Sequence, residues 1–217
     1  MKKEVSKTQK ALNLWAIILI IWSIYRSKFH LPEWFDEFIA KPVIFILPVY
    51  YYIKNIDKKD FLPALYFKPK LIIKDLLIGF VIGGIFFLSA TAANFVKYHK
   101  LIFFSRVTTG SFFAIILMAL ATGISEEILS RGFVLKKLYE ESKNIFTSSF
   151  FASILFFFLH VPILFTNLKI TGNLLLLFMV TDIIISLALS FIFLIRKSLA
   201  LPIIIHAFYN VIVILFV

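Results

Sequence analysis

The chain has 217 residues, 61% of them hydrophobic, and its mean hydropathy is +0.96. Soluble domains are about 45–50% apolar, so this composition exceeds the needs of a soluble core and indicates helices that face lipid. The absence of cysteine excludes disulfides, thiolate nucleophiles and thiolate metal ligands. The net charge of +11 does not indicate nucleic-acid binding, because the basic residues lie in short loops between apolar segments, where they set membrane orientation.

Apolar segments follow one another along the whole chain. A span needs roughly 20 such residues, or fewer where flanking side chains snorkel. The first segment follows a basic N-terminus, and no small-residue cleavage site comes after Tyr25, so we expect a retained span. Pro42 and Pro48 are expected to bend the second segment. The seven segments run over approximately 11–25, 38–53, 71–96, 111–134, 145–165, 173–195 and 199–217.

These segments predict an all-α fold, a polytopic transmembrane helical bundle of about seven spans. An eighth helix, re-entrant or interfacial, has two candidate places, Phe61 to Phe67 and Leu101 to Arg106. No connection is long enough to bury a core of its own. We therefore divide one integral-membrane unit into an N-terminal three-helix membrane region, residues 1–110, and a membrane core, residues 111–217.

Lysine and arginine are unevenly distributed between the two sets of loops that seven spans create. Most of them precede the first span or follow the second, fourth and sixth spans. Positive charge favours the cytoplasmic side. The distribution predicts a multi-pass protein of the cell membrane with a cytoplasmic N-terminus and an outside C-terminus.

Two acids and an arginine interrupt the fourth span. An ionisable side chain inside the bilayer is costly and calls for a partner or a function. Glu127 and Arg131 stand four residues apart, on one face of a helix, and can pair. Glu126 lies about 100° away around the helix. The sequence therefore predicts a structural ion pair for Glu127 and leaves Glu126 available as a general base.

Two histidines and an asparagine lie in the fifth and seventh spans. His160 follows a run of phenylalanines, and Phe156, one turn earlier on the same face, can pack against its imidazole. His206 and Asn210 stand four residues apart, so their polar groups also share one face. Donors held in this way can stabilise an oxyanion.

Each of these residues alone has an ordinary structural explanation, such as a buried hydrogen bond or an ion pair. Asp182 in the sixth span is either a helix-bonding group, an acid at a loop edge or a functional residue. The combination is more informative, because three separate helices bring polar side chains into the apolar region and one shared polar cavity satisfies them all. The predicted orientation places Glu126 near the cytoplasmic side and His160 in the far half of its span. They meet if the span boundaries shift or the site lies at mid-membrane.

Three short motifs, each in an apolar span and in this order, resemble those of the CPBP intramembrane proteases. They are Glu126-Glu127-x-x-x-Arg131, Phe156-x-x-x-His160 and His206-x-x-x-Asn210. This family includes the CAAX prenyl endopeptidases and the bacterial proteins called Abi or bacteriocin-processing and immunity proteins. The resemblance covers residues 111–217. Ser130 is a departure, since an aromatic residue is common before the arginine.

The resemblance implies a glutamate-type intramembrane endopeptidase that needs no cofactor and forms no covalent intermediate. The implied catalytic residues are Glu126 and His160, which activate a water, and His206 and Asn210, which stabilise the oxyanion. The supporting residues are Glu127, Arg131 and Phe156. The implied substrate is a hydrophobic or membrane-anchored peptide or protein that reaches the site from the bilayer.

Three other hypotheses stay open on the sequence. Glu126, His160 and His206 form a chemically reasonable zinc set, although the chain has no His-Glu-x-x-His motif. Some proteins of the CPBP family act as non-catalytic immunity or scaffold proteins on a membrane partner, which is the main alternative. Buried Glu, Asp and His also suit a transporter or proton relay, in which Asp182 would matter.

Overall fold

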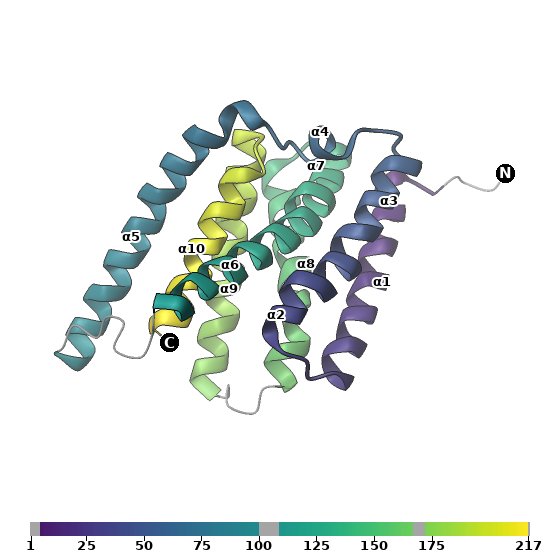
Figure 1. The fold of residues 1–217 in the computed structure, drawn as a ribbon. Coiled ribbons are helices and arrows are strands. Elements are labelled where there is room, and N and C mark those ends of the chain that lie inside the picture. Colours follow the sequence, from purple (N-terminus) through teal and green to yellow (C-terminus); the bar gives the residue numbers. More distant parts are fainter. Residues whose placement is uncertain (1–4, 100–108, 167–171, 217) are drawn as a thin grey trace.

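A computed structural model describes residues 5–99, 109–166 and 172–216, and this part of the chain is helical with short turns and no strand (Figure 1). The all-α prediction is therefore confirmed. The elements, in chain order, are α1 (Lys7–Lys28), α2 (Glu33–Phe35), η1 (Asp36–Ala40), η2 (Pro42–Ile46), α3 (Leu47–Asn55), α4 (Phe61–Ala64), η3 (Pro69–Leu71), α5 (Ile72–Tyr98), α6 (Thr109–Glu127), η4 (Ile128–Leu135), α7 (Lys136–Ser142), α8 (Ile145–Thr166), α9 (Gly172–Arg196) and α10 (Ala200–Phe216).

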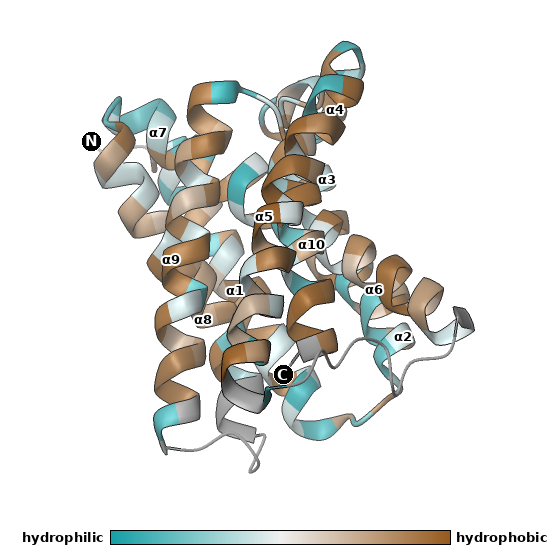
Figure 2. Ribbon diagram, turned by 90° about the vertical axis from the view of Figure 1, so that its left-hand side faces the viewer, coloured by the Kyte–Doolittle hydropathy of each residue, from teal (hydrophilic) through white to brown (hydrophobic). Residues whose placement is uncertain are grey.

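Several helices of the described ranges have the length and hydropathy needed to cross a membrane, and α10 adds a shorter apolar helix over Ala200–Leu215. Figure 2 shows their hydrophobic residues along the middle of the bundle and hydrophilic residues gathered towards its ends. The chain is therefore a multi-pass membrane protein. The five long spans are Lys7–Lys28, Pro69–Val96, Gly110–Ser142, Ile145–Pro162 and Leu175–Arg196.

The expected second segment, 38–53, differs from these spans. It belongs to a helix that runs without a break from Glu33 to Asn55 and lies beside α1 (Figure 1). Lys41, its prolines and its tyrosines make it less apolar than the five long spans. Proline cannot donate a backbone hydrogen bond, and the wide π-helical turns η1 and η2 lie on either side of Lys41, next to Pro42.

The ends of the helices separate into two groups (Figure 1). The start of α1, α4, α7 and the connection from α9 to α10 lie at one end of the bundle, and α2 and the end of α10 lie towards the other. The basic loops predicted to share one side of the membrane therefore lie at one end of the bundle. The extra helix expected at Phe61 to Phe67 is present as α4, whereas the alternative at Leu101 to Arg106 lies outside the described residues.

The fourth span is longer than the sequence predicted. Residues 109–142 form one continuous helix of α6, the π-helix η4 and α7, whereas we expected its end near residue 134. Glu126 and Glu127 consequently lie near the middle of this helix and not near its end. The shift of this boundary removes the apparent difference in depth between these acids and His160.

The N-terminal region and the C-terminal half share one buried core. Trp15 of α1 and Phe45 of η2 belong to the same cluster as Phe133, Phe156 and Phe193. Tyr52 packs edge-on against Phe133 with 5.0 Å between the ring centroids. Residues 1–110 therefore help to position the helices that carry the three motifs.

Candidate active site

Glu126 faces both motif histidines. Its Oε2 atom lies 3.6 Å from Nε2 of His160 on α8 and 3.8 Å from Nε2 of His206 on α10. Both separations exceed a direct hydrogen bond, and Oε2 is a buried oxygen without a hydrogen-bond partner. A water bound to this oxygen can therefore reach an imidazole nitrogen as well.

Glu127 makes the predicted ion pair and one further contact. Its Oε1 atom lies 2.7 Å from Nη1 of Arg131 and 2.8 Å from Nδ1 of His206. Because the carboxylate accepts, Nδ1 of His206 carries the proton and its Nε2 is directed towards Glu126. The sequence predicted the arginine contact but not the contact with His206.

Arg131 is itself held from several sides. Its Nη2 atom donates to the hydroxyl of Ser186 at 2.9 Å and to the carbonyl of Ser186 at 3.2 Å. Its guanidinium carbon lies 4.2 Å from the centroid of the Phe156 ring. Arg131 and Glu127 are 1% and 0% exposed, so the ion pair is fully buried. Both Nη1 and Nη2 of Arg131 have hydrogen-bond acceptors.

Phe156 packs against both imidazoles, as the spacing predicted for the first of them. Its ring centroid lies 4.8 Å from that of His160 and 5.9 Å from that of His206. One aromatic side chain thus packs against the guanidinium of Arg131 and against both imidazoles, and it restricts the orientation of the two histidine rings.

A cavity of about 170 Å³ opens between α8, α9 and α10. His160, Asp182, His206 and Asn210 contribute polar groups to its wall, and the remaining wall is apolar or aromatic. A polar cavity of this size has room for water. The other lining residues are Phe156, Phe178, Ile185, Leu189, Tyr209 and Val213.

Asp182, whose role the sequence left open, lies beside His160. Its Oδ2 atom is 3.5 Å from Nδ1 of His160, and neither atom has a hydrogen-bond partner. Buried polar atoms are rarely left unpaired, so this pair marks a second place for water or for a substrate group.

Lys41 is the site residue that sequence reasoning missed. Its Nζ atom donates to Oε1 of Glu126 at 2.8 Å and to Oε1 of Glu37 at 2.7 Å. The available signal was a lysine within an apolar segment, the same signal that singled out Glu126 and Glu127. For Lys41 this signal is weaker, because it stands near the edge of the predicted segment 38–53, where a long basic side chain can reach the membrane surface.

Glu126, His160 and His206, the residues of the alternative zinc hypothesis, lie close together around Oε2 of Glu126. Among the described residues, no group of three or more His, Asp or Glu side chains is arranged to hold a metal ion.

Comparison with known protein families matches residues 107–212 to the family described as Type II CAAX prenyl endopeptidase Rce1-like. The matched range contains all three motifs and excludes the N-terminal region that supplies Lys41. Comparison with curated proteins finds no match.

Proposed function

Because this chain belongs, through residues 107–212, to the Rce1-like CAAX protease family, we propose that it is an intramembrane endopeptidase that uses water activated by Glu126 and His160. The observation that carries this proposal is the unpartnered Oε2 atom of Glu126, which faces both imidazoles across gaps of 3.6 and 3.8 Å. A carboxylate with one free buried oxygen beside an imidazole suits a general base.

The reaction begins with a water that donates one hydrogen bond to Oε2 of Glu126. Asp182 favours a proton on Nδ1 of His160, so the unprotonated Nε2 accepts the second hydrogen bond of the water. The water oxygen bonds to the peptide carbonyl carbon, and its proton passes to Glu126. Collapse of the tetrahedral intermediate breaks the C–N bond, and Glu126 returns the proton to the leaving amine.

Asn210 donates from its amide to the oxyanion of this intermediate. His206 donates from Nε2 as a doubly protonated imidazolium, because its Nδ1 proton already goes to Glu127. They stand four residues apart on α10, and both reach the cavity wall. Glu127 and Arg131 hold the imidazole of His206 from its Nδ1 side. A donor that is fixed before the reaction costs no reorganisation when negative charge develops.

The substrate is a hydrophobic or membrane-anchored peptide or protein. The cavity lies between transmembrane helices and its wall combines aromatic and aliphatic side chains with four polar ones. A hydrophobic peptide segment can approach such a site from the bilayer, while the polar groups retain water for the reaction.

The proposed reaction uses no cofactor. Metal analysis of the purified protein and cleavage assays with a chelator test this point. Full activity of metal-free protein is expected, and a cleavage activity that disappears on chelation and returns with Zn²⁺ would replace this mechanism by that of a zinc protease.

We also propose the orientation that the basic loops favour, with a cytoplasmic N-terminus and an outside C-terminus. The chain has no cysteine, so single cysteines report accessibility without background. In intact cells, a membrane-impermeant maleimide is expected to label His30→Cys and to leave Lys58→Cys unlabelled. The opposite pattern would reverse the orientation.

The decisive test compares the membrane peptides of cells that carry the wild type with those of cells that carry Glu126→Gln. Uncut substrates are expected to accumulate in Glu126→Gln and in His160→Ala, and not in Glu141→Gln, which alters an exposed acid. If cellular phenotype and peptide profile are unchanged in both site variants at normal abundance, the chain acts as a non-catalytic immunity or scaffold protein.

A further inference from the structure

The contacts of Lys41 extend the proposed function to the N-terminal region. We propose that Lys41 is a positioning residue for Glu126, whose ammonium holds Oε1 and so directs Oε2 towards His160. This inference rests on the proposed function. Lys41 lies outside the range that matches the family, so the family match does not assign it any role.

The carboxylate of Glu126 is held by one oxygen. Oε1 accepts the 2.8 Å hydrogen bond from Lys41, and Oε2 has no partner. A carboxylate on a flexible side chain can otherwise turn about its last bond and exchange the two oxygens. A charge-assisted hydrogen bond to Oε1 favours the orientation in which Oε2 faces His160.

Lys41 is fixed in turn from its own helix and from α6. Glu37, one turn before Lys41, accepts from its ammonium at 2.7 Å. The other oxygen of Glu37 accepts a 2.6 Å hydrogen bond from the hydroxyl of Thr122. Thr122 stands one turn before Glu126 on α6. Hydrogen bonds therefore link the α6 helix to the helix of Lys41 at two places, through Thr122 to Glu37 and through Glu126 to Lys41.

The backbone around Lys41 explains how an N-terminal residue reaches the site. Lys41 stands between the π-helical turns η1 and η2, directly before Pro42. Such turns are often found where a helix presents a functional side chain. The Lys41 side chain is 8% exposed and its ammonium lies 5.9 Å from the Trp22 ring, so bulk water does not compete strongly for it.

The distribution of charges in the site also favours Lys41 as the partner of Glu126. Glu127 is neutralised by Arg131 on the same helix, whereas Glu126 lies five residues from Arg131 and takes its cation from Lys41. Removing one member of a buried ion pair leaves an uncompensated charge. A neutral residue at position 41 should therefore leave both Glu126 and Glu37 without the lysine counter-charge.

The experiment uses the full chain and kinetic measurements on a substrate identified from the membrane peptides. Lys41→Met is expected to lower kcat by about 10²-fold, since small misplacements of a reacting group have effects of this order, with KM nearly unchanged. Lys54→Met is the matched control, because Lys54 pairs with Asp60 at 2.9 Å in an exposed position. It should keep the wild-type kcat.

Chemical rescue distinguishes the effect of the Lys41 charge from the effect of the volume of its side chain. Because the chain contains no cysteine, Lys41→Cys offers one thiol. Alkylation with 2-bromoethylamine restores an ammonium at nearly the length of lysine and is expected to recover kcat, whereas alkylation with iodoacetamide is expected to leave it low. Equal recovery with both reagents, or a fully active Lys41→Met, would overturn the positioning role.

Thermal unfolding provides a readout that does not depend on cleavage. A double-mutant cycle of Lys41→Met and Glu126→Gln is expected to show non-additive losses, and additive losses would overturn the contact on which the proposal rests. If Lys41→Met does not accumulate, the variant Lys41→Met/Glu37→Gln removes one acid as well and is used in the same cycle.

A wild type that cleaves no peptide overturns the proposed function together with this inference. A cleaving wild type with an equally active Lys41→Met overturns this inference alone.

Discussion

Nδ1 of His206 and Nη1 of Arg131 meet at the same oxygen of Glu127, at 2.8 and 2.7 Å. One buried carboxylate oxygen thus connects η4 with α10 and holds the imidazole whose Nε2 faces Glu126. Glu127 therefore contacts His206 as well as Arg131, and we expect its removal to affect both stability and cleavage.

Glu127→Gln is expected to lower the free energy of unfolding by about 3–5 kcal/mol, because it leaves the buried guanidinium of Arg131 without its counter-charge. The measurement is thermal unfolding in detergent. Glu141→Gln is the control, since Glu141 is exposed and surface changes stay within about 0.5 kcal/mol. Equal unfolding midpoints for the two variants would show that the ion pair does not stabilise the bundle.

Asp182→Asn is expected to lower kcat by ~10² while leaving the unfolding midpoint nearly unchanged. Asparagine has almost the same shape as aspartate but does not favour a proton on Nδ1 of His160, 3.5 Å away. Asp60→Asn, which alters an acid at the surface, is the kinetic control. A variant with the kcat of the wild type would assign Asp182 a structural role only.

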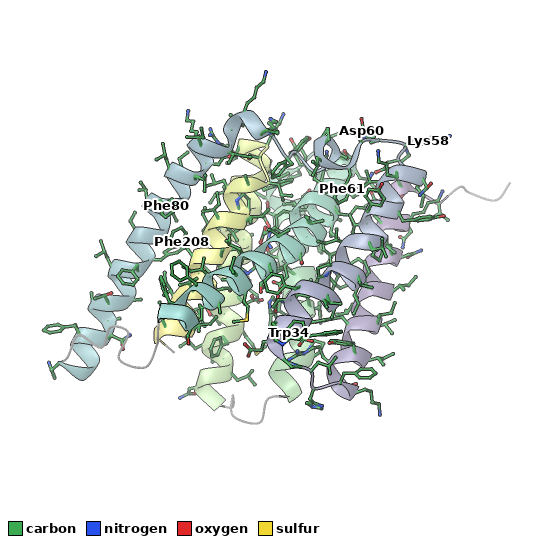
Figure 3. The ribbon with its side chains drawn as sticks, viewed as in Figure 1. Trp34, Lys58, Asp60, Phe61, Phe80 and Phe208 are labelled. Carbon is green, nitrogen blue, oxygen red and sulfur yellow. The ribbon has the colours of Figure 1, made fainter. Side chains whose placement is uncertain are left out.

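Gly83→Ala is expected to destabilise the contact between α5 and α10, which Figure 3 shows with Phe80 and Phe208 directed towards each other. A Cβ at Gly83 would lie 2.4–2.7 Å from atoms of the Phe208 ring, whereas a Cβ at Gly84 meets nothing within 4 Å. Overpacking costs about 1–3 kcal/mol.

Gly84→Ala serves as the matched control, because alanine favours a helix over glycine by about 1 kcal/mol without a clash at this position. The unfolding midpoint should fall in Gly83→Ala and stay level or rise in Gly84→Ala. The double variant Gly83→Ala/Phe208→Ala should lose less than the sum of the single losses. Equal midpoints for the two alanine variants would contradict the close approach of α5 to α10.

Asp75→Asn is expected to lower the free energy of unfolding by about 1.5–3 kcal/mol, the range for hydrogen bonds to charged groups. Asp75 is fully buried, and its carboxylate accepts from Arg196 Nε at 3.0 Å and from the Ser198 hydroxyl at 2.5 Å. These contacts tie the first turn of α5 to the connection between α9 and α10. Thermal unfolding measures the loss.

Asp60→Asn is the control for this prediction as well. The Lys54–Asp60 pair lies at the exposed end of the bundle, where Figure 3 labels Asp60, and the Asp60 side chain is 82% exposed. Exposed ion pairs contribute about 0–1 kcal/mol. A loss in Asp60→Asn as large as that in Asp75→Asn would contradict the difference in burial.

Features that depend on local spacing and composition could be predicted from the sequence alone. Long apolar runs predicted an all-α membrane bundle, because backbone groups in lipid must be satisfied within each helix. The four-residue spacing of Glu127 and Arg131 predicted their ion pair, and that of Phe156 and His160 predicted their packing, since helix geometry alone places such residues together. The three motifs also indicated one shared site.

The tertiary structure decided which residues of separate helices meet. The partners of Glu126 include Lys41, 85 residues earlier, and His206 reaches Glu127 across 79 residues. The unexpected length of the fourth span set the depth of both acids. Such contacts depend on the rotation, tilt and longitudinal position of each packed helix, and the periodicity of a sequence does not determine any of the three. The sequence therefore indicated a polar site, whereas helix packing determines which oxygen of Glu126 has no partner.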